Sequence, residues 1–334
     1  MPICLCLKCV YIEKDKKTKL FFQCSLTSIP GDNMRTFNSL TLVSTIIAAA
    51  GGIHAEESTV IIFGGGIDEG KAEAYPAACN LDLPEDTGNL YGLGAAVLDG
   101  SVYYCGGMTF TQGDYRKVCY KNIFGTWVEV DSMLFRRAYS PVVTVGSNII
   151  AAGGWNDFVV HDTVEIFDGE SWNLLPWKMT GRRTEMCVVP ISDREVIMIG
   201  GYTGDDHLNT VEVYDLVEGW VATLPDMPTT RRGLACVLHE NEIYVAGGLD
   251  SFSATPSKNT VEVLNLETLE WRPMASMNQN RHYLTMEVVN GSLTVFGGWE
   301  AGSKSLEVYT EGEWIEESLE YNHAFHASVS LPCV

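Results

Sequence analysis

Arginine is the residue type whose spacing best suggests chemistry in this sequence. Four arginines recur at similar distances along the chain: Arg137, Arg183, Arg232 and Arg281. Three of them directly follow another arginine: Arg136, Arg182 and Arg231. A guanidinium group can donate two parallel hydrogen bonds to a carboxylate or a phosphate. If the chain brings these side chains together, we expect them to bind an acidic peptide or an acidic glycan.

Three aromatic residues follow glycine pairs directly and are expected to begin loops on one rim of the fold. They are Trp155, Tyr202 and Trp299. An aromatic ring beside an arginine can stack on a sugar or on a peptide side chain. Packing within the rim is the alternative that the sequence leaves open.

Signatures of enzymes and metal sites are scarce. The histidines show no recurring ligand spacing, and His323 and His326 would point to opposite faces of a strand. There is no nucleophile elbow and no phosphate-binding loop. We therefore expect no catalytic residue, no metal and no cofactor.

Six of the ten cysteines lie in the repeated part of the chain: Cys79, Cys105, Cys119, Cys187, Cys236 and Cys333. An even number permits disulfides in a secreted protein. Cys105 and Cys119 flank one hairpin and form the best-placed pair, and Cys79 with Cys333 is a second candidate. Cys187 and Cys236 occupy matching positions on two strands, where we favour packing of small buried residues.

Asn290 begins the sequence Asn-Gly-Ser between two expected strands. Asn-Gly suits a type I′ hairpin turn in any compartment. The same three residues are an N-glycosylation acceptor if the chain is secreted.

Six glycine pairs divide most of the chain into units of similar length. The pairs are Gly64-Gly65, Gly106-Gly107, Gly153-Gly154, Gly200-Gly201, Gly247-Gly248 and Gly297-Gly298. Each follows a β-rich run, such as Val196 to Ile199, and a second β-rich run and a tryptophan follow in most units. Each unit thus has four short strands without helical periodicity, which is typical of one propeller blade.

The glycine pair with a spaced tyrosine and tryptophan resembles the kelch repeat, from Thr59 to about Leu331. The resemblance implies an all-β fold, a six-bladed kelch-type β-propeller with four-stranded blades. The unit that begins at Gly64 lacks an innermost strand and its tryptophan. We expect the strand from His326 to Leu331 to supply the missing strand and close the ring.

Propeller symmetry would place the second arginine of each pair around the central channel. The resemblance also offers a structural role, in which each arginine pairs with a strand glutamate. The candidate partners are Glu165, Glu212, Glu262 and Glu307. The first arginine of each pair is expected to face solvent.

Residues 1–55 differ from the rest of the chain and are read as a leader, followed by the propeller at residues 56–334. Residues 34–55 have the layout of a secretory signal peptide, with Arg35 before an apolar run. Residues 1–33 would then be an over-extended start. An uncleaved signal anchor, which would tether the protein to a membrane, and a leader without targeting function are the alternatives.

Net charge restricts the partners. The formal charge is −21, and the residues from Glu56 onward carry −24. Such a chain is not expected to bind nucleic acid or to insert in a membrane beyond its leader. Oligomeric state cannot be deduced from the sequence.

The leading functional hypothesis is a secreted, non-enzymatic interaction module that binds an acidic peptide or glycan through an arginine- and aromatic-lined rim. Among kelch-like propellers, a sialic-acid mutarotase shares six blades, a signal peptide and interior arginines, so it is the alternative enzyme. Without a signal peptide, a cytoplasmic scaffold associated with actin or ubiquitin ligases is the third hypothesis. Ubiquitin-ligase adaptors have a dimerisation domain ahead of the propeller, for which this sequence is expected to have no room.

Overall fold

The structure is a computed structural model and describes most of the chain after the leader. The described residues are 8–11, 22–25, 58–65, 70–76, 83–109, 114–156, 158–251, 257–300 and 303–332. The chain separates into two compact units, Met1–Thr41 and Leu42–Val334. In the first unit, β1 (Lys8–Tyr11) and β2 (Phe22–Ser25) form an antiparallel pair. The predicted signal peptide lies outside the described residues.

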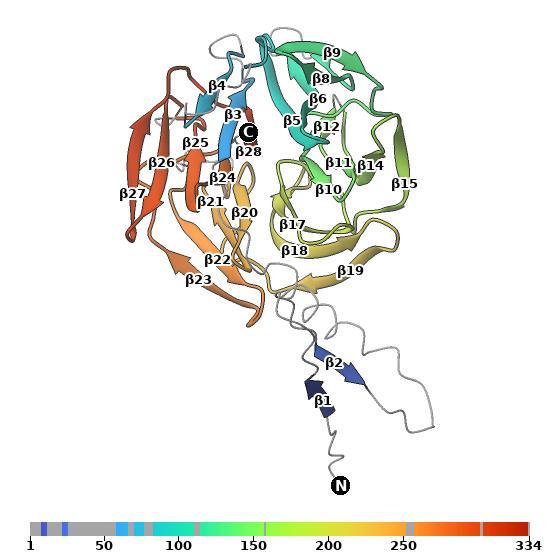
Figure 1. Ribbon diagram of the computed structural model, residues 1–334, viewed down its shortest axis with the longest axis vertical. Coiled ribbons are helices and arrows are strands. Elements are labelled where there is room, and N and C mark those ends of the chain that lie inside the picture. The colour runs from blue at the N-terminus through green and yellow to red at the C-terminus, as the bar shows by residue number, and fades with distance from the viewer. Residues whose placement is uncertain are drawn as a thin grey trace. The chain divides into compact units, whose positions relative to one another are not determined.

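Six antiparallel sheets make up the second unit, and they are the six blades of a propeller (Figure 1). Blade 1 contains β28 (Ala327–Pro332), β3 (Ser58–Phe63) and β4 (Glu73–Tyr75). Blade 2 contains β5 (Leu90–Leu98), β6 (Ser101–Thr109), β7 (Asp114–Tyr115), β8 (Cys119–Ile123) and β9 (Thr126–Val130). Blade 3 contains β10 (Val142–Val145), β11 (Asn148–Ala152), β14 (Thr163–Phe167) and β15 (Trp172–Lys178), with a hairpin of β12 (Trp155–Asn156) and β13 (Val159–Val160).

The remaining blades have four strands each. Blade 4 contains β16 (Cys187–Pro190), β17 (Glu195–Tyr202), β18 (His207–Asp215) and β19 (Gly219–Leu224). Blade 5 contains β20 (Ala235–His239), β21 (Glu242–Ala246), β22 (Val261–Asn265) and β23 (Glu270–Met274). Blade 6 contains β24 (Thr285–Val289), β25 (Ser292–Phe296), β26 (Ser305–Thr310) and β27 (Glu313–Ser318). The six-bladed, all-β fold predicted from the sequence is therefore confirmed.

The second strand of each blade forms the core between blades. β11 and β17 are buried at every position except the first, because both faces of the sheet pack against neighbouring blades. Ile149 and Ile150 in β11, and Val196, Ile197 and Ile199 in β17, have branched side chains that fit a pleated surface buried on both sides. The outer strands, such as β9, are mostly exposed.

The glycine pairs stand where these core strands end, and all twelve glycines have positive φ. At Gly153, an added Cβ would lie 2.0 Å from the carbonyl oxygen of Arg183, a residue of the next blade. The first glycine of the pair is thus required both by backbone angle and by the close approach of another chain segment.

The C-terminal strand closes the ring. β28 pairs antiparallel with β3, from Ala327 opposite Phe63 to Pro332 opposite Ser58. Figure 1 shows the two ends of the propeller side by side in blade 1, with β28 inside β3. The predicted closure is confirmed. No helix able to cross a membrane occurs in the part of the chain that the structure describes.

Candidate binding sites on the propeller axis

One position repeats in all six blades and defines where the arginines lie. The second glycine of each pair donates its N–H to the carbonyl of a residue that begins the next blade. These residues are Leu90, Arg137, Arg183, Arg231, Arg281 and His323. The equivalent arginine of blade 5 is therefore Arg231, and the sequence-based assignment of Arg232 to this position was wrong by one residue.

The side chains at this position are buried, and all but Leu90 pair with acids of their own blade. The pairs are Arg137–Glu165 at 2.8 Å, Arg183–Glu212 at 2.8 Å, Arg231–Glu262 at 3.2 Å, Arg281–Glu307 at 3.0 Å and His323–Glu73 at 2.7 Å. This is the structural alternative that the sequence offered. Because the guanidinium groups are enclosed, they do not form a free ring around the channel.

The paired glutamates also hold the loops of the rim. Glu307 accepts hydrogen bonds from the backbone N–H groups of Asn278 (2.6 Å) and Gln279 (3.1 Å) as well as from Arg281. Arg281 in turn donates to the carbonyls of Gly297 and Ser305. Burial lowers the pKa of Arg281, and Glu307 opposes that shift. The network therefore ties the loop before the inner strand to the glycine pair of the same blade.

Of the first arginines in each pair, two face solvent as predicted and one does not. Arg136 and Arg182 are exposed, with Asp114 at 3.8 Å and Asp205 at 3.4 Å. Arg231 is fully buried, because it and not Arg232 occupies the structural position. Arg136 and Arg182 therefore each have an acidic side chain nearby.

Arg232 has a different environment, near the channel end. Its Nη1 donates to Glu185 Oε2 at 2.7 Å and to the Tyr283 hydroxyl at 3.1 Å, and its Nε lies 3.1 Å from His207 Nε2. The guanidinium carbon is 5.6 Å from the centre of the Tyr202 ring. Burial raises the pKa of Glu185 despite the adjacent Arg232. Arg232 is thus a predicted binding arginine that lies beside a predicted rim aromatic, Tyr202.

A closed ring of backbone hydrogen bonds surrounds this end of the channel. One residue from each blade takes part, all six with φ between 52° and 60°: Gly92, Tyr139, Glu185, Gly233, Tyr283 and Phe325. Each N–H donates to the carbonyl of the preceding member, at distances from 2.8 to 3.3 Å, and Gly92 closes the ring by donating to Phe325. Gly92 lies within β5 but is skipped in its pairing with β6, and the other five members lie outside the strands, so these bonds link the blades directly.

The side chains of this ring fill its centre. Tyr283 stacks on Phe325 with ring centres 4.4 Å apart, Tyr139 lies 5.4 Å from Tyr283, and the Tyr283 hydroxyl donates to Glu185 at 2.8 Å. An added Cβ on Gly92 would lie 2.7 Å from the Tyr139 ring, so glycine leaves the space that the ring needs. The channel is therefore closed at this end by aromatic side chains.

These rings continue onto the surface as a face that we call the aromatic face. It comprises Tyr91, Tyr139, Tyr283, Trp299 and Phe325. Phe325 is at its centre, 5.7 Å from Tyr91 and 5.4 Å from Trp299 between ring centres. Trp299 is 44% exposed. The aromatic face thus offers rings to solvent around the propeller axis.

The three predicted rim aromatics differ in burial and in the residues that they contact. Trp299 joins the aromatic face, whereas Tyr202 is buried and its hydroxyl donates to the carbonyl of Gly204. Trp155 is half-buried in the β12–β13 hairpin and pairs with Val160. Packing within the rim, the alternative left open by the sequence, describes Tyr202 best.

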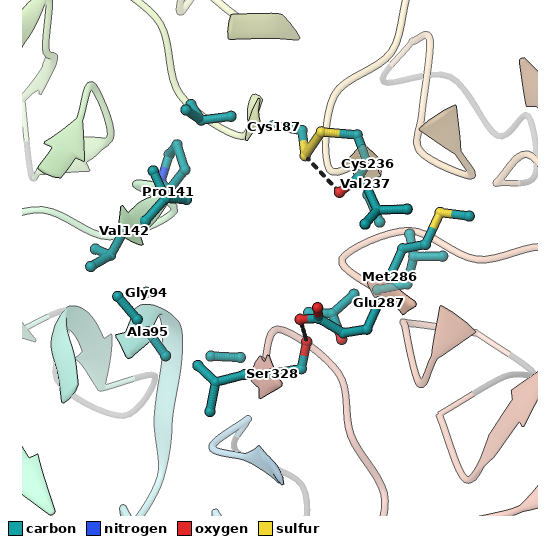
Figure 2. A pocket seen from close by; sticks show the side chains of 18 of the residues that line it. Gly94, Ala95, Pro141, Val142, Cys187, Cys236, Val237, Met286, Glu287 and Ser328 are labelled. Carbon is teal, nitrogen blue, oxygen red and sulfur yellow. Dashed lines mark hydrogen bonds between the residues drawn. A yellow bond between two sulfur atoms is a disulfide. The ribbon is translucent and has the colours of Figure 1, made fainter. Parts of the chain in front are cut away.

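The channel itself is a cavity of about 640 Å³ lined by the inner strands of all six blades. Its lining stops at the ring that bears Tyr139 and Tyr283. Figure 2 shows the labelled lining residues around an open centre, with the Cys187–Cys236 disulfide in one wall and Glu287 bonded to Ser328 in another. Most other labelled side chains are apolar or small.

Two disulfides are formed among the described residues. Cys105–Cys119 joins neighbouring strands of blade 2, as predicted. Cys187–Cys236 joins the inner strands of blades 4 and 5, so the expectation that these two cysteines only pack was wrong. Matching positions on adjacent inner strands bring the two sulfur atoms together across the blade boundary. Cys79 and Cys333 lie outside the described residues.

Asn290 lies at the turn between β24 and β25 and is exposed. Both Asn290 and Gly291 have positive φ, as a type I′ turn requires. Its Oδ1 accepts a hydrogen bond from the N–H of Ser58. Within the described ranges, no group of three or more His, Cys, Asp or Glu side chains could hold a metal ion.

Sequence reasoning missed two features of the axis. The backbone ring has no sequence signature, because its members are of four residue types that share only their φ. Glu287 belongs to one blade alone, so a search for recurring residues passes over it. A search for a charged residue among the β-branched residues of an inner strand would have found it.

Comparison with known proteins finds similarity to kelch-repeat proteins. The family model described as the Kelch motif matches residues 183–228 and 230–278. An F-box/kelch-repeat protein of Arabidopsis thaliana is 28% identical over 170 residues, covering 48% of this chain and 48% of the relative. Kelch-like protein 23 of Homo sapiens is 26% identical over 254 residues, covering 72% of this chain and 41% of the relative. The chain thus spans about half the length, or less, of these curated relatives.

Solved structures agree on the architecture. The structure of YjhT matches with a TM-score of 0.61 and 15% identity, covering 75% of this chain and 88% of that one. At this identity the likeness concerns the fold alone. Together with the six glycine pairs and the C-terminal closure, these matches identify kelch repeats in this chain and support assignment to a kelch-repeat family of β-propellers.

Proposed function

We propose that this protein is a secreted, non-enzymatic interaction module, and that a partner protein docks on the aromatic face. Kelch propellers are protein-interaction modules in general, which gives the broad function. The observation that supports the site is the continuous set of rings from Tyr91 through Phe325 to Trp299.

Aromatic rings are suited to this role for physical reasons. They bury a large apolar area with few rotatable bonds, so binding costs little conformational entropy. The rings beneath Trp299 are already packed on one another and held by the backbone ring, so the face is preorganised. A partner side chain placed against Trp299 and Phe325 would meet a rigid surface.

The geometry supports aromatic contact better than the acidic ligand predicted from the sequence. Four of the seven arginines are enclosed in ion pairs, and Arg232 is paired with Glu185. Arg136 and Arg182 remain exposed and are the cations left to attract an acidic group. The same enclosure gives no support to the arginine ring that the mutarotase alternative invokes.

Secretion is supported by the cysteines. Disulfides persist in oxidising compartments and are rare in the cytosol, and two are formed among the described residues. The signal-peptide layout of residues 34–55 points the same way.

The experiment compares two tryptophan variants. Trp299→Ala removes the exposed ring of the aromatic face, and Trp220→Ala removes a ring of similar exposure, 51%, on the outer strand β19. Tagged wild type and both variants are incubated with conditioned medium, and the recovered proteins are quantified by mass spectrometry. A hit is then purified and its affinity measured by calorimetry.

We expect Trp299→Ala to weaken binding by about 2 kcal/mol, or roughly thirtyfold, as for a tryptophan at the centre of an interface. Trp220→Ala should leave the affinity unchanged. A partner that binds both variants as tightly as wild type would rule out the aromatic face as its site. Equal melting temperatures of the two variants serve as the control for folding.

A further inference from the structure

The channel is a pocket with one closed end and one open end. The closed end is formed by Tyr139, Tyr283 and Phe325. At the other end the lining reaches Val97, Thr144 and Ser330, and Ser330 is exposed to solvent. A volume of about 640 Å³ is within the range of small-molecule sites, roughly 300 to 1,000 Å³.

Lysine and arginine, which could neutralise an acid, are missing from the lining that the structure describes. The two acidic lining residues in the described part of the chain are Glu185 and Glu287. Glu185 is at the closed end, where its carboxylate accepts hydrogen bonds from Arg232 and Tyr283. Most of the remaining lining is apolar, including Ala95, Pro141 and the Cys187–Cys236 bridge.

Glu287 is the acid that faces this pocket from its side wall. Its Oε1 accepts a hydrogen bond from the Ser328 hydroxyl at 2.9 Å (Figure 2). No ion pair to Glu287 occurs among the residues that the structure describes. Burial raises the pKa of Glu287 to about 7, which is the response of a carboxyl in an apolar site without a cation.

We propose that the channel binds a primary ammonium group carried on an unbranched apolar chain, with the ammonium beside Glu287 and the chain in the closed end. This site is separate from the aromatic face and does not depend on the proposed partner. Glu287 lies within β24, and Tyr283 precedes the first residue of that strand by two positions. The lining between them includes Leu284 and Met286, which give an alkyl chain an apolar space between the carboxylate and the aromatic closure.

The chemistry favours ammonium over other cations. An ammonium can donate to Glu287 and to Ser328 Oγ from one compact centre, whereas a guanidinium needs both carboxylate oxygens for its fork. Calcium takes six to eight oxygen ligands, and this wall offers one carboxylate with one hydroxyl. Displacing water from apolar walls adds to the affinity of the chain.

Ionisation of Glu287 makes the site dependent on pH. The carboxyl is protonated below about pH 7 and charged above it, so affinity for an ammonium should rise between pH 6 and pH 8. Two histidines lie on the neighbouring inner segments. His326 directly precedes β28, and His239 is the last residue of β20. His326 has a pKa well below 6.5 because it is buried, so it stays neutral over this range. Ser328 and Thr285 do not titrate.

The test uses n-hexylamine as the probe and calorimetry as the measurement. Hexan-1-ol and hexanoate are the uncharged and oppositely charged controls of the same length. We expect hexylamine to bind wild type at least tenfold more tightly than either control at pH 8. Glu287→Gln should weaken hexylamine at least tenfold and abolish the rise with pH, while Glu313→Gln, at an exposed site on β27, should change neither.

A second variant tests the apolar part without touching the carboxylate. Ala95→Leu adds bulk to the apolar wall on β5 and should weaken octylamine more than butylamine. The probe N-acetyl-lysine methylamide separates the possible sources of the ammonium. Tighter binding of hexylamine than of this lysine derivative identifies a free amphiphile with its chain inward. The reverse order, equal binding of hexanol, or an unchanged affinity in a folded Glu287→Gln protein would overturn the proposal.

Discussion

Arg281 shows what the recurring arginine does at the scale of a single residue. Its guanidinium pairs with Glu307, and both side chains are fully buried. A buried charge is costly unless it is paired and hydrogen-bonded, and this one is met by a carboxylate, two carbonyls and a hydroxyl. The position therefore stabilises the blade and is not available to a ligand.

Replacing Arg281 by alanine should destabilise the fold by about 3 to 5 kcal/mol, because Glu307 would be left buried without its cation. Arg182→Ala, at an exposed position, should change stability by less than about 0.5 kcal/mol. Urea unfolding followed by tryptophan fluorescence measures both. Equal midpoints for the two variants would contradict the structural role of Arg281.

Part of this arginine–glutamate pairing could be predicted from the sequence. Glutamates at matching strand positions were identified as partners before the contacts were known, because they recur with the same spacing. The adjacent arginines of blade 5 could not be told apart, since a shift of one residue leaves the pattern intact. The pair of His323 and Glu73 in blade 1 was missed because a histidine takes the place of the recurring arginine.

At the scale of elements, the two disulfides have different effects on the blades. Cys105–Cys119 joins strands that are already hydrogen-bonded within blade 2. Cys187–Cys236 joins β16 to β20, which belong to different sheets. The second bridge therefore restrains the packing between blades 4 and 5.

Removing the inter-blade bridge should cost more stability. In the loop-entropy model, a bridge with a sequence separation of 49 contributes roughly 4 kcal/mol and one with 14 roughly 3 kcal/mol. We expect the double variant Cys187→Ser/Cys236→Ser to unfold at a lower urea concentration than Cys105→Ser/Cys119→Ser. Intact mass of wild type from the medium of secretory cells, before and after reduction, checks that both bridges form. Reduced protein that stays inside the cell would contradict both the bridges and the proposed secretion.

For the whole molecule, stability depends on the closure of the ring by β28. Every described residue of this strand pairs with β3, which lies more than 260 residues earlier in the chain. The period of the glycine pairs and the count of strands predicted this closure from sequence, because an incomplete first blade needs a strand from elsewhere. The backbone ring around the axis was not predictable, since it arises from φ angles and not from residue types.

Deleting Tyr321 to Val334 should therefore prevent stable folding, because it removes β28, His323 and Phe325 together. Deleting Cys333 and Val334 alone is the matched control and should keep the melting temperature of wild type within a few degrees. Thermal unfolding followed by circular dichroism distinguishes the outcomes. A truncated protein that lacks β28 and melts at the wild-type temperature would show that closure does not carry the fold.

The hydrogen-bonded ring at the closed end of the channel also limits which sequences can replace this one. Each of its six members must offer an N–H and must adopt positive φ. Proline can do neither, since its φ is fixed near −65° and it has no N–H. Positions 92, 139, 185, 233, 283 and 325 should therefore exclude proline in any blade exchanged between two such propellers, although glycine, tyrosine, phenylalanine and glutamate all occur among them here.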